Sequence, residues 1–205
     1  VGADGGSHQQ IEDIAIMRVI PNMRVILPAD SVAVSKLTWI IAQQYGPFYM
    51  RMCRSKTPII HNDSQEFQVG KAITMREGSD CTIAACGITV KMALDAADLL
   101  NQDGISCRVI DCFSIKPIDK ELLEKAARET GAIVTCEEHN VMGGFGSAVS
   151  EVVSESYPVP IRRIGVQDKF GESARDNEIA QLLEKHGMTP INIINMVKEA
   201  RSQKQ

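Results

Sequence analysis

Residues 81–112 read CTIAACGITVKMALDAADLLNQDGISCRVIDC, and this stretch decides the fold class. Two short apolar runs, 81–86 and 107–112, have the length of buried strands. Between them, residues 89–101 place alanine and leucine on one face at helical spacing, and Gly104 lies where a C-terminal helix cap is expected. A strand, a helix and a second strand in this order are typical of a mostly parallel sheet.

The same alternation continues to the end of the chain. Expected helices span 118–130, 147–157, 175–186 and 190–202, and expected strands span 132–136 and 161–165. Gly131 follows the first of these helices, and the last begins with Thr189 as its cap and Pro190 at its first position. The sequence therefore predicts a complete α/β domain with a mostly parallel sheet and helices on both faces.

The N-terminal part has the pattern of a smaller α/β layer. We expect a helix at 9–20, a strand at 23–27, a helix at 32–45 and a strand at 48–53. Residues 56–78 are more polar and are interpreted as a connector with a short strand around 67–75. The predicted division is therefore a partial domain at 1–62, a connector at 63–78 and a complete domain at 79–205.

Composition excludes several classes of function. Hydrophobic residues make up 44% and charged residues 23% of the chain, and the formal net charge is −4, so no nucleic-acid partner is expected. No apolar run reaches the length of a membrane span and no secretory signal is visible, which favours a cytoplasmic location without membrane contact. The six cysteines include no Cys-x-x-Cys pair, so we expect reduced core thiols and neither disulfides nor a metal site.

The first candidate site is the segment GADGGSHQ at residues 2–9. Its glycines permit close approach of backbone to a ligand, and Asp4 and His8 can exchange hydrogen bonds with hydroxyl groups. A helix is expected to follow directly, and a helix N-terminus favours anions. The alternative is a capped turn in which Ser7 caps that helix.

This segment resembles the Gly-Glu-Asp-Gly-Pro-Thr-His-Gln motif of transketolases. Ala3, Gly6 and Ser7 depart from the motif, whereas Asp4 and His8 keep both their identity and their spacing. The resemblance implies that Asp4 binds a sugar hydroxyl. It also implies that His8 lies beside the reacting ends of substrate and cofactor.

The second candidate is the segment YMRMCRS at residues 49–55. An arginine at the carboxyl end of a parallel strand is well placed to bind phosphate, although a surface ion pair is the alternative. Transketolases carry a phosphate-binding arginine here, which implies that role for Arg54. Related deoxyxylulose-phosphate synthases have Arg-Tyr-Pro-Arg at this place, so Arg51 is the second choice. Residues 51 and 54 would face opposite sides of a regular strand, so only one should enter the site.

The third candidate is Glu-Glu-His-Asn at 137–140 followed by Gly-Gly-Phe-Gly at 143–146. Val149 stands where a dinucleotide-binding loop would need its last glycine. The resemblance implies a structural role and subunit contacts for this run. His61 and His186 have no metal partners nearby in the sequence and are predicted to be surface residues.

Further segments follow the order seen in transketolases, so the resemblance covers essentially the whole chain. It implies transfer of a two-carbon ketol unit between sugar phosphates, with thiamine diphosphate and Mg²⁺ in the complete enzyme. The family's diphosphate site and its cofactor-activating glutamate are not found, and the chain begins inside a motif. We therefore expect a portion that binds no cofactor alone, is inactive alone, and works as a homodimer, with an N-terminal transketolase portion, or both.

Two other functions fit the same residues. A 1-deoxyxylulose-5-phosphate synthase or an E1 β-type subunit of a 2-oxoacid dehydrogenase is the alternative among enzymes, and a non-catalytic assembly or regulatory module is the alternative from another class. We further expect Ile11, Ile14, Ile26 and Leu27 to require cover from a partner. Residues from about 70 onward would then be the part that folds independently.

Overall fold

The computed structural model describes residues 10–53, 56–175 and 178–204. Its elements in chain order are α1 (Asp13–Val19), β1 (Arg24–Ile26), α2 (Ser31–Ala42), β2 (Phe48–Met50), β3 (Ile73–Arg76), β4 (Cys81–Ala85), α3 (Thr89–Gln102), β5 (Cys107–Asp111), β6 (Ser114–Lys116), α4 (Lys120–Thr130), β7 (Ile133–Asn140), α5 (Phe145–Ser156), β8 (Ile161–Val166), α6 (Ile179–Lys185) and α7 (Pro190–Ser202).

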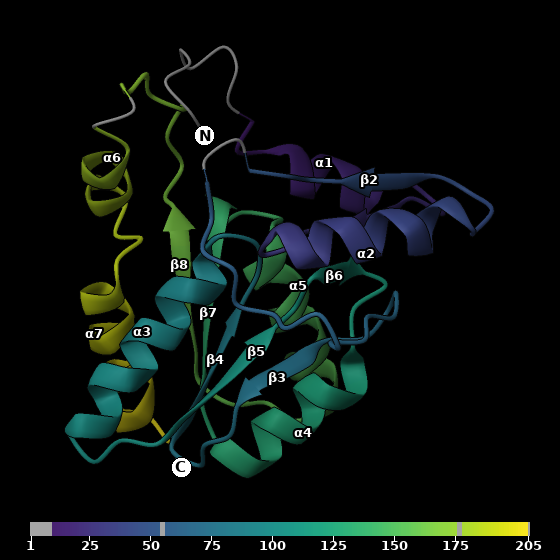
Figure 1. Cartoon of the computed structure of the whole chain (residues 1–205). Coiled ribbons are helices and arrows are strands. Elements are labelled where there is room, and N and C mark those ends of the chain that lie inside the picture. The colour runs from purple at the N-terminus through teal and green to yellow at the C-terminus, as the bar shows by residue number, and fades with distance from the viewer. Residues whose placement is uncertain (1–9, 54–55, 176–177, 205) are drawn as a thin grey trace.

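A five-stranded sheet of order β3-β5-β4-β7-β8 forms the body of the molecule (Figure 1). β5, β4, β7 and β8 pair in parallel, and only β3 joins antiparallel. Helices α3 and α7 cover one face of this sheet, and α4 and α5 cover the other. The predicted α/β class, with a mostly parallel sheet between two helical layers, is confirmed.

Local capping signals set the ends of α4 and α7, and those at Gly131 and Thr189 were expected. The side chain of Asp119 accepts the N–H of Leu122 at the start of α4, and Gly131 ends that helix with φ of 67°, where glycine is favoured. Thr189 caps α7, whose first residue is Pro190. α6 is shorter than the predicted helix at 175–186 and begins at Ile179.

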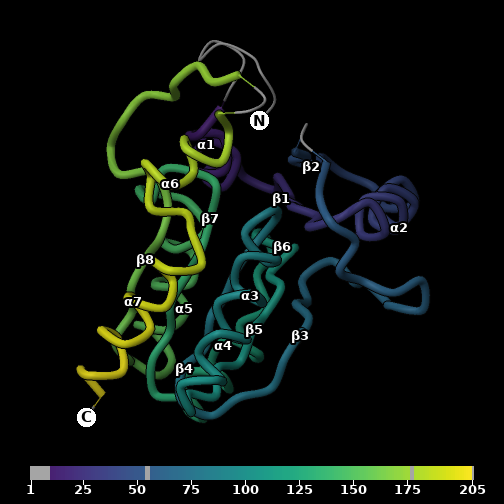
Figure 2. Tube along the Cα trace, turned by 60° about the vertical axis from the view of Figure 1, so that its left-hand side comes forward, coloured from purple at the N-terminus to yellow at the C-terminus, as the bar shows by residue number. Residues whose placement is uncertain are grey.

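The N-terminal segment builds a second, smaller sheet that includes a strand from the C-terminal part. β1 pairs in parallel with β2 and antiparallel with β6. β6 was not expected from the sequence. It follows β5 closely, and the Phe113 carbonyl between them accepts the N–H of Leu27 at 2.7 Å. Figure 2 shows β1 between the main body and the α2–β2 layer at its side. β1 and β6 therefore join the two parts of the chain.

The expectation that the N-terminal apolar residues need a partner's cover is wrong for the four residues on which it rested. Ile11, Ile14, Ile26 and Leu27 are at most 6% exposed within this chain. Ile14 and Leu27 belong to the same core as α4 and α5, and Ile26 packs with Phe113. The C-terminal domain therefore supplies the cover that was assigned to an absent partner.

Two further expectations concern cysteines and membranes. All six cysteines are free; Cys53 is half-buried, and the others are buried in strands or directly after them, as predicted. Among the helices of the described residues, none is long and apolar enough to cross a membrane.

Candidate functional site

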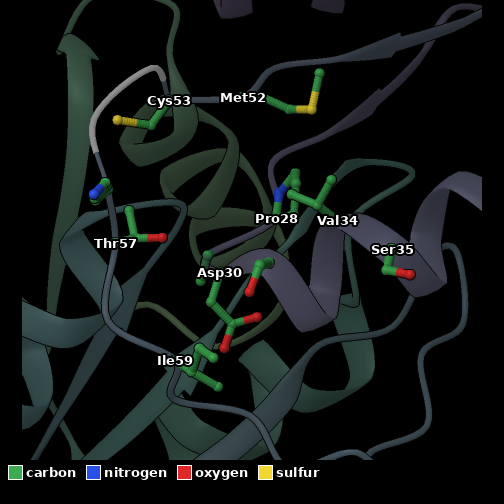
Figure 3. Close-up of a pocket in the computed structure, with 11 residues that line it drawn as sticks. Pro28, Asp30, Val34, Ser35, Met52, Cys53, Thr57 and Ile59 are labelled. Carbon is green, nitrogen blue, oxygen red and sulfur yellow. The ribbon is translucent and has the colours of Figure 1, made fainter. Parts of the chain in front are cut away.

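A cleft of about 550 Å³ opens beyond the carboxyl ends of β1 and β2. Its walls are formed by the turn into α2, the first turns of α2 and the segment that follows β2. Its lining residues are Pro28, Ala29, Asp30, Ser31, Val34, Ser35, Met52, Cys53, Lys56, Thr57 and Ile59. In Figure 3, Met52 and Cys53 lie on one side of the space, and Asp30 and Ile59 lie on the opposite side. Ligands of open α/β sheets bind at this edge.

Three of the four predicted site residues lie outside the described residues. These are Asp4, His8 and Arg54. In the sequence, Arg54 stands directly after Cys53 and two positions before Lys56, both of which line the cleft. The cleft therefore lies at the carboxyl end of β2, where phosphate binding was predicted from the sequence.

Arg51, the second choice for phosphate, is engaged by carboxylates of this chain. Its Nε lies 3.0 Å from Oδ2 of Asp13 and its Nη1 lies 3.3 Å from Oε2 of Glu138. Its Nη2 also donates to the backbone carbonyl of Glu138 at 2.9 Å. Burial alone would lower the pKa of Arg51, but the charges of Glu138 and Asp13 raise it. The guanidinium joins the end of β2 to α1 and β7, and it is not among the residues that line the cleft.

Tyr49 belongs to the same cluster. Its hydroxyl donates to Oδ2 of Asp13 at 2.7 Å. Burial and this bond to a carboxylate raise the pKa of Tyr49 to about 12, so the phenol stays protonated at neutral pH. Asp13 is thereby held by two donors from the β2 segment.

The Glu-Glu-His run at 137–139 connects elements inside the chain. Nε2 of His139 accepts the backbone N–H of Ile14 at 3.1 Å, and its Nδ1 lies 2.6 Å from the carbonyl of Asn140. Nδ1 therefore carries the proton, and the ring is neutral. Burial lowers the pKa of His139, which agrees with this assignment. The structural role expected for this run takes the form of a contact between β7 and α1.

Glu137 caps the helix that follows the run. Its two carboxylate oxygens accept the N–H groups of Phe145 at 2.6 Å and Gly146 at 2.8 Å, at the start of α5. Burial raises the pKa of Glu137 to about 7, while these two backbone bonds oppose the rise. The backbone of the glycine-rich stretch thus donates hydrogen bonds to a buried carboxylate of the same chain.

Asp30 forms the floor of the cleft and anchors two segments. Its Oδ1 accepts the N–H of Ala33, which caps α2, and its Oδ2 accepts the N–H groups of Ile60 and His61, each at 2.8 Å. Backbone hydrogen bonds outweigh the effect of burial and lower the pKa of Asp30. The wall of the cleft near Ile59 is therefore fixed through Asp30.

The prediction that His61 and His186 are surface residues is wrong. His61 is 4% exposed and lies between Asp30 and Asp111. The His186 side chain is 6% exposed and lies against Glu172. A single histidine in a polar stretch gives no local signal of burial, because the residues that cover it are distant in the sequence.

Two family models match most of the chain. Residues 70–193 match the family described as transketolase, C-terminal domain, and residues 1–59 match the transketolase pyrimidine binding domain. The chain belongs to the transketolase family. A structure described as a split gene transketolase, inactive beta4 tetramer, superposes with a TM-score of 0.93 at 47% identity, covering 98% of this chain and 65% of that one.

Two relatives of this transketolase chain have named activities. The 6-deoxy-6-sulfo-D-fructose transketolase subunit of Clostridium sp. is 41% identical over 98% of the chain and 62% of its own length. The 1-deoxy-D-xylulose-5-phosphate synthase of Heliobacterium modesticaldum is 37% identical over 97% of the chain and 31% of its own length. The transketolase chain thus spans less than two thirds of either relative.

The described part of this transketolase chain offers no metal site. No group of three or more His, Cys, Asp or Glu side chains within it could hold a metal ion.

Proposed function

We propose that this chain is the substrate-binding C-terminal part of a transketolase that moves a two-carbon ketol unit from a ketose phosphate to an aldose phosphate. The observation that carries the proposal is the cleft beyond β1 and β2, with Cys53 and Lys56 on its wall and Arg54 between them in the sequence. A cleft of about 550 Å³ is within the range of small-molecule sites.

Each site residue has a distinct role in the proposal. Arg54 binds the phosphate end of the sugar, because a guanidinium matches phosphate with paired hydrogen bonds. Lys56 adds a positive charge at the same cleft. Asp4 holds a sugar hydroxyl, and His8 lies beside the reacting end and exchanges a proton with it.

The remaining parts of the reaction come from outside the described residues. The carbanion chemistry is supplied by thiamine diphosphate, bound with Mg²⁺ in the complete enzyme. An N-terminal transketolase portion provides that site, and a homodimer, a complex with that portion, or both complete the active centre. The complete enzyme works in the cytoplasm.

Substitutions in the assembled enzyme test these roles. Arg54→Ala should chiefly raise KM for phosphorylated sugars and leave unphosphorylated ones nearly unchanged. His8→Ala should reduce kcat by roughly 10²–10⁴. Lys125→Ala, which removes an exposed lysine of α4 far from the cleft, is the matched control. If Arg51→Ala shows the phosphate selectivity and Arg54→Ala does not, the assignment of Arg54 is refuted.

The synthase relative supports a second candidate function, formation of 1-deoxyxylulose 5-phosphate. Analysis of the products of the assembled enzyme separates the two reactions, because only the synthase forms that deoxy sugar phosphate. The chain could also assemble with the N-terminal portion, bind cofactor and form neither the ketol-transfer product nor the deoxy sugar phosphate. That result would contradict both candidate functions and favour the non-catalytic module.

A further inference from the structure

His61 lies between two buried carboxylates that belong to different parts of the chain. Its Nδ1 lies 3.1 Å from Oδ2 of Asp30, and its Nε2 lies 3.2 Å from Oδ2 of Asp111. All three side chains are fully buried. The contact to Asp111 is close enough for an ion pair, although its alignment falls short of a standard hydrogen bond.

The arrangement requires one proton more than a neutral histidine and two ionised carboxylates can supply. Ionised carboxylates only accept hydrogen bonds, and a neutral imidazole donates from one nitrogen alone. Among the described residues, neither oxygen of Asp111 has a hydrogen bond from any other group. A buried carboxylate without a counter-charge is costly, and burial raises the pKa of Asp111, so the extra proton lies either on His61 as an imidazolium or on Asp111 as a neutral acid.

The three residues join the cleft to the main sheet. Asp30 caps α2 and lines the cleft, and Asp111 is the last residue of β5. His61 stands two residues after Ile59, which lines the same cleft. The edge of the His61 ring packs against Phe67 at 5.1 Å between centroids, which fixes its orientation.

We propose that His61, as an imidazolium between Asp30 and Asp111, is a positioning residue that fixes the Asp30 wall of the substrate cleft to the C-terminal sheet. The inference rests on the proposed function, since it assigns His61 to the site of the sugar phosphate. His61 is not among the residues that line the cleft, so it acts through Asp30.

Electrostatics supports the charged state. Burial alone would lower the pKa of His61, but Asp111 and Asp30 together raise it. The other titratable groups near Asp111 are the thiols of Cys86 and Cys112, whose pKa values burial raises, so they stay uncharged. Because the folded-state pKa lies above the ordinary value of about 6.5, the bridge is fully formed below that pH. Its stabilisation is lost as the pH rises through the folded-state pKa.

Nuclear magnetic resonance of the full chain tests the charge without any assay of activity. The chain has four histidines. The signal that is present in the wild type and missing in His61→Gln belongs to His61. We expect both nitrogens of His61 to be protonated at pH 7, whereas His139 is neutral. Asp111→Asn should lower the pKa of His61. A neutral His61 at pH 7 in the wild-type chain would overturn the proposal, whether or not the variants fold.

Kinetics of the assembled enzyme tests the positioning. His61→Gln should raise KM for the phosphorylated substrate about 10-fold and change kcat by less than about 3-fold. The wild-type enzyme should show a rise in KM at high pH, and His61→Gln should not show this rise. His186→Gln, directly after α6 and not among the residues that line the cleft, should leave KM and its pH profile unchanged. An unchanged KM in His61→Gln refutes the positioning role, whereas an enzyme that lacks ketol transfer but has a charged His61 refutes only the proposed function.

Discussion

Nε2 of His139 accepts the backbone N–H of Ile14 at 3.1 Å, so a side chain of the main sheet caps the first helix of the chain. The residue at the N-cap position itself, Glu12, makes no side-chain capping bond to α1. The first N–H groups of a helix have no partner within it, and a buried helix start must find one elsewhere. The order of α1 therefore depends on a neutral His139 in β7.

Acidification should weaken this contact. Burial lowers the pKa of His139, so below about 6.5 the unfolded chain binds a proton that the folded chain does not. His139 should therefore contribute a fall in the free energy of unfolding with decreasing pH below about 6.5, because a protonated Nε2 cannot accept from Ile14. Glu137, whose pKa burial raises to about 7, contributes a change of opposite sign, so the difference between the wild type and a His139 variant isolates the effect. Urea unfolding at several pH values measures how the free energy of unfolding changes with pH, called the acid slope below. Hydrogen exchange at Ile14 and Ala15 tests whether the loss of protection occurs at the start of α1.

His139→Gln is the informative variant for this test. A glutamine keeps an acceptor and does not titrate between pH 5 and 7. The variant should retain much of the protection of α1 and lose part of the acid slope. An acid slope identical to that of the wild type would show that His139 does not cause it.

Gly144→Ala should destabilise the chain by about 1–3 kcal/mol, the usual cost of overpacking a core. A methyl group at this position would lie 2.1 Å from Oε2 of Glu137 and 2.6 Å from Nδ1 of His139. Both neighbours are buried and hydrogen-bonded, so neither can move away without losing its contacts. Ser154→Ala on the exposed side of α5 is the control, and chemical denaturation compares the two. Equal stability of both variants would contradict the role of Glu137 as a fixed cap.

The Arg51 cluster should contribute more to stability than any surface ion pair. Arg51→Ala removes the guanidinium that pairs with the buried Asp13, and the loss of one partner of a buried pair costs about 3–5 kcal/mol. Lys125→Ala removes an exposed pair with Glu129 within α4 and should cost less than about 0.5 kcal/mol. Thermal and urea unfolding of both variants measure the difference. Similar losses in both would mean that the cluster around Arg51 is open to solvent in solution.

The elements set by local rules could be predicted from the sequence. The caps Asp119 and Thr189 and the stop at Gly131 act within a few residues, so their patterns suffice. β6 could not be predicted, because its three residues become a strand only by pairing with β1. The burial of Ile14 and Leu27 likewise depends on helices of the later domain.

The candidate site could be predicted only where a motif carries it. The resemblance assigned Asp4, His8 and Arg54, and these assignments stay predictions because they lie outside the described residues. The roles of Asp30 and His61 were missed. The cap that Asp30 provides for α2 is local, but the second set of partners of Asp30 comes from Ile60 and His61. Contacts between distant segments have no signal in a single sequence.

Cys53 should be the first thiol of the folded chain to react with a disulfide reagent. It is half-buried and lines the cleft, whereas the other cysteines are buried. Burial raises the pKa of Cys81 to about 12 and that of Cys107 to about 11, which leaves almost no thiolate in either at neutral pH. Thiol titration of the native chain should therefore detect Cys53 first, and denaturation should release all six.

The same thiol reports on the occupant of the cleft. A sugar phosphate bound beside Cys53 should slow its modification in the assembled enzyme, because the ligand and the reagent compete for one space. The unphosphorylated sugar at equal concentration is the control for non-specific protection. Cys53→Ser should abolish the fast phase and leave the remaining thiols slow. If the fast phase persists in Cys53→Ser, a cysteine of the main sheet is exposed in solution and the packing of β4, β5 and β7 differs from that described.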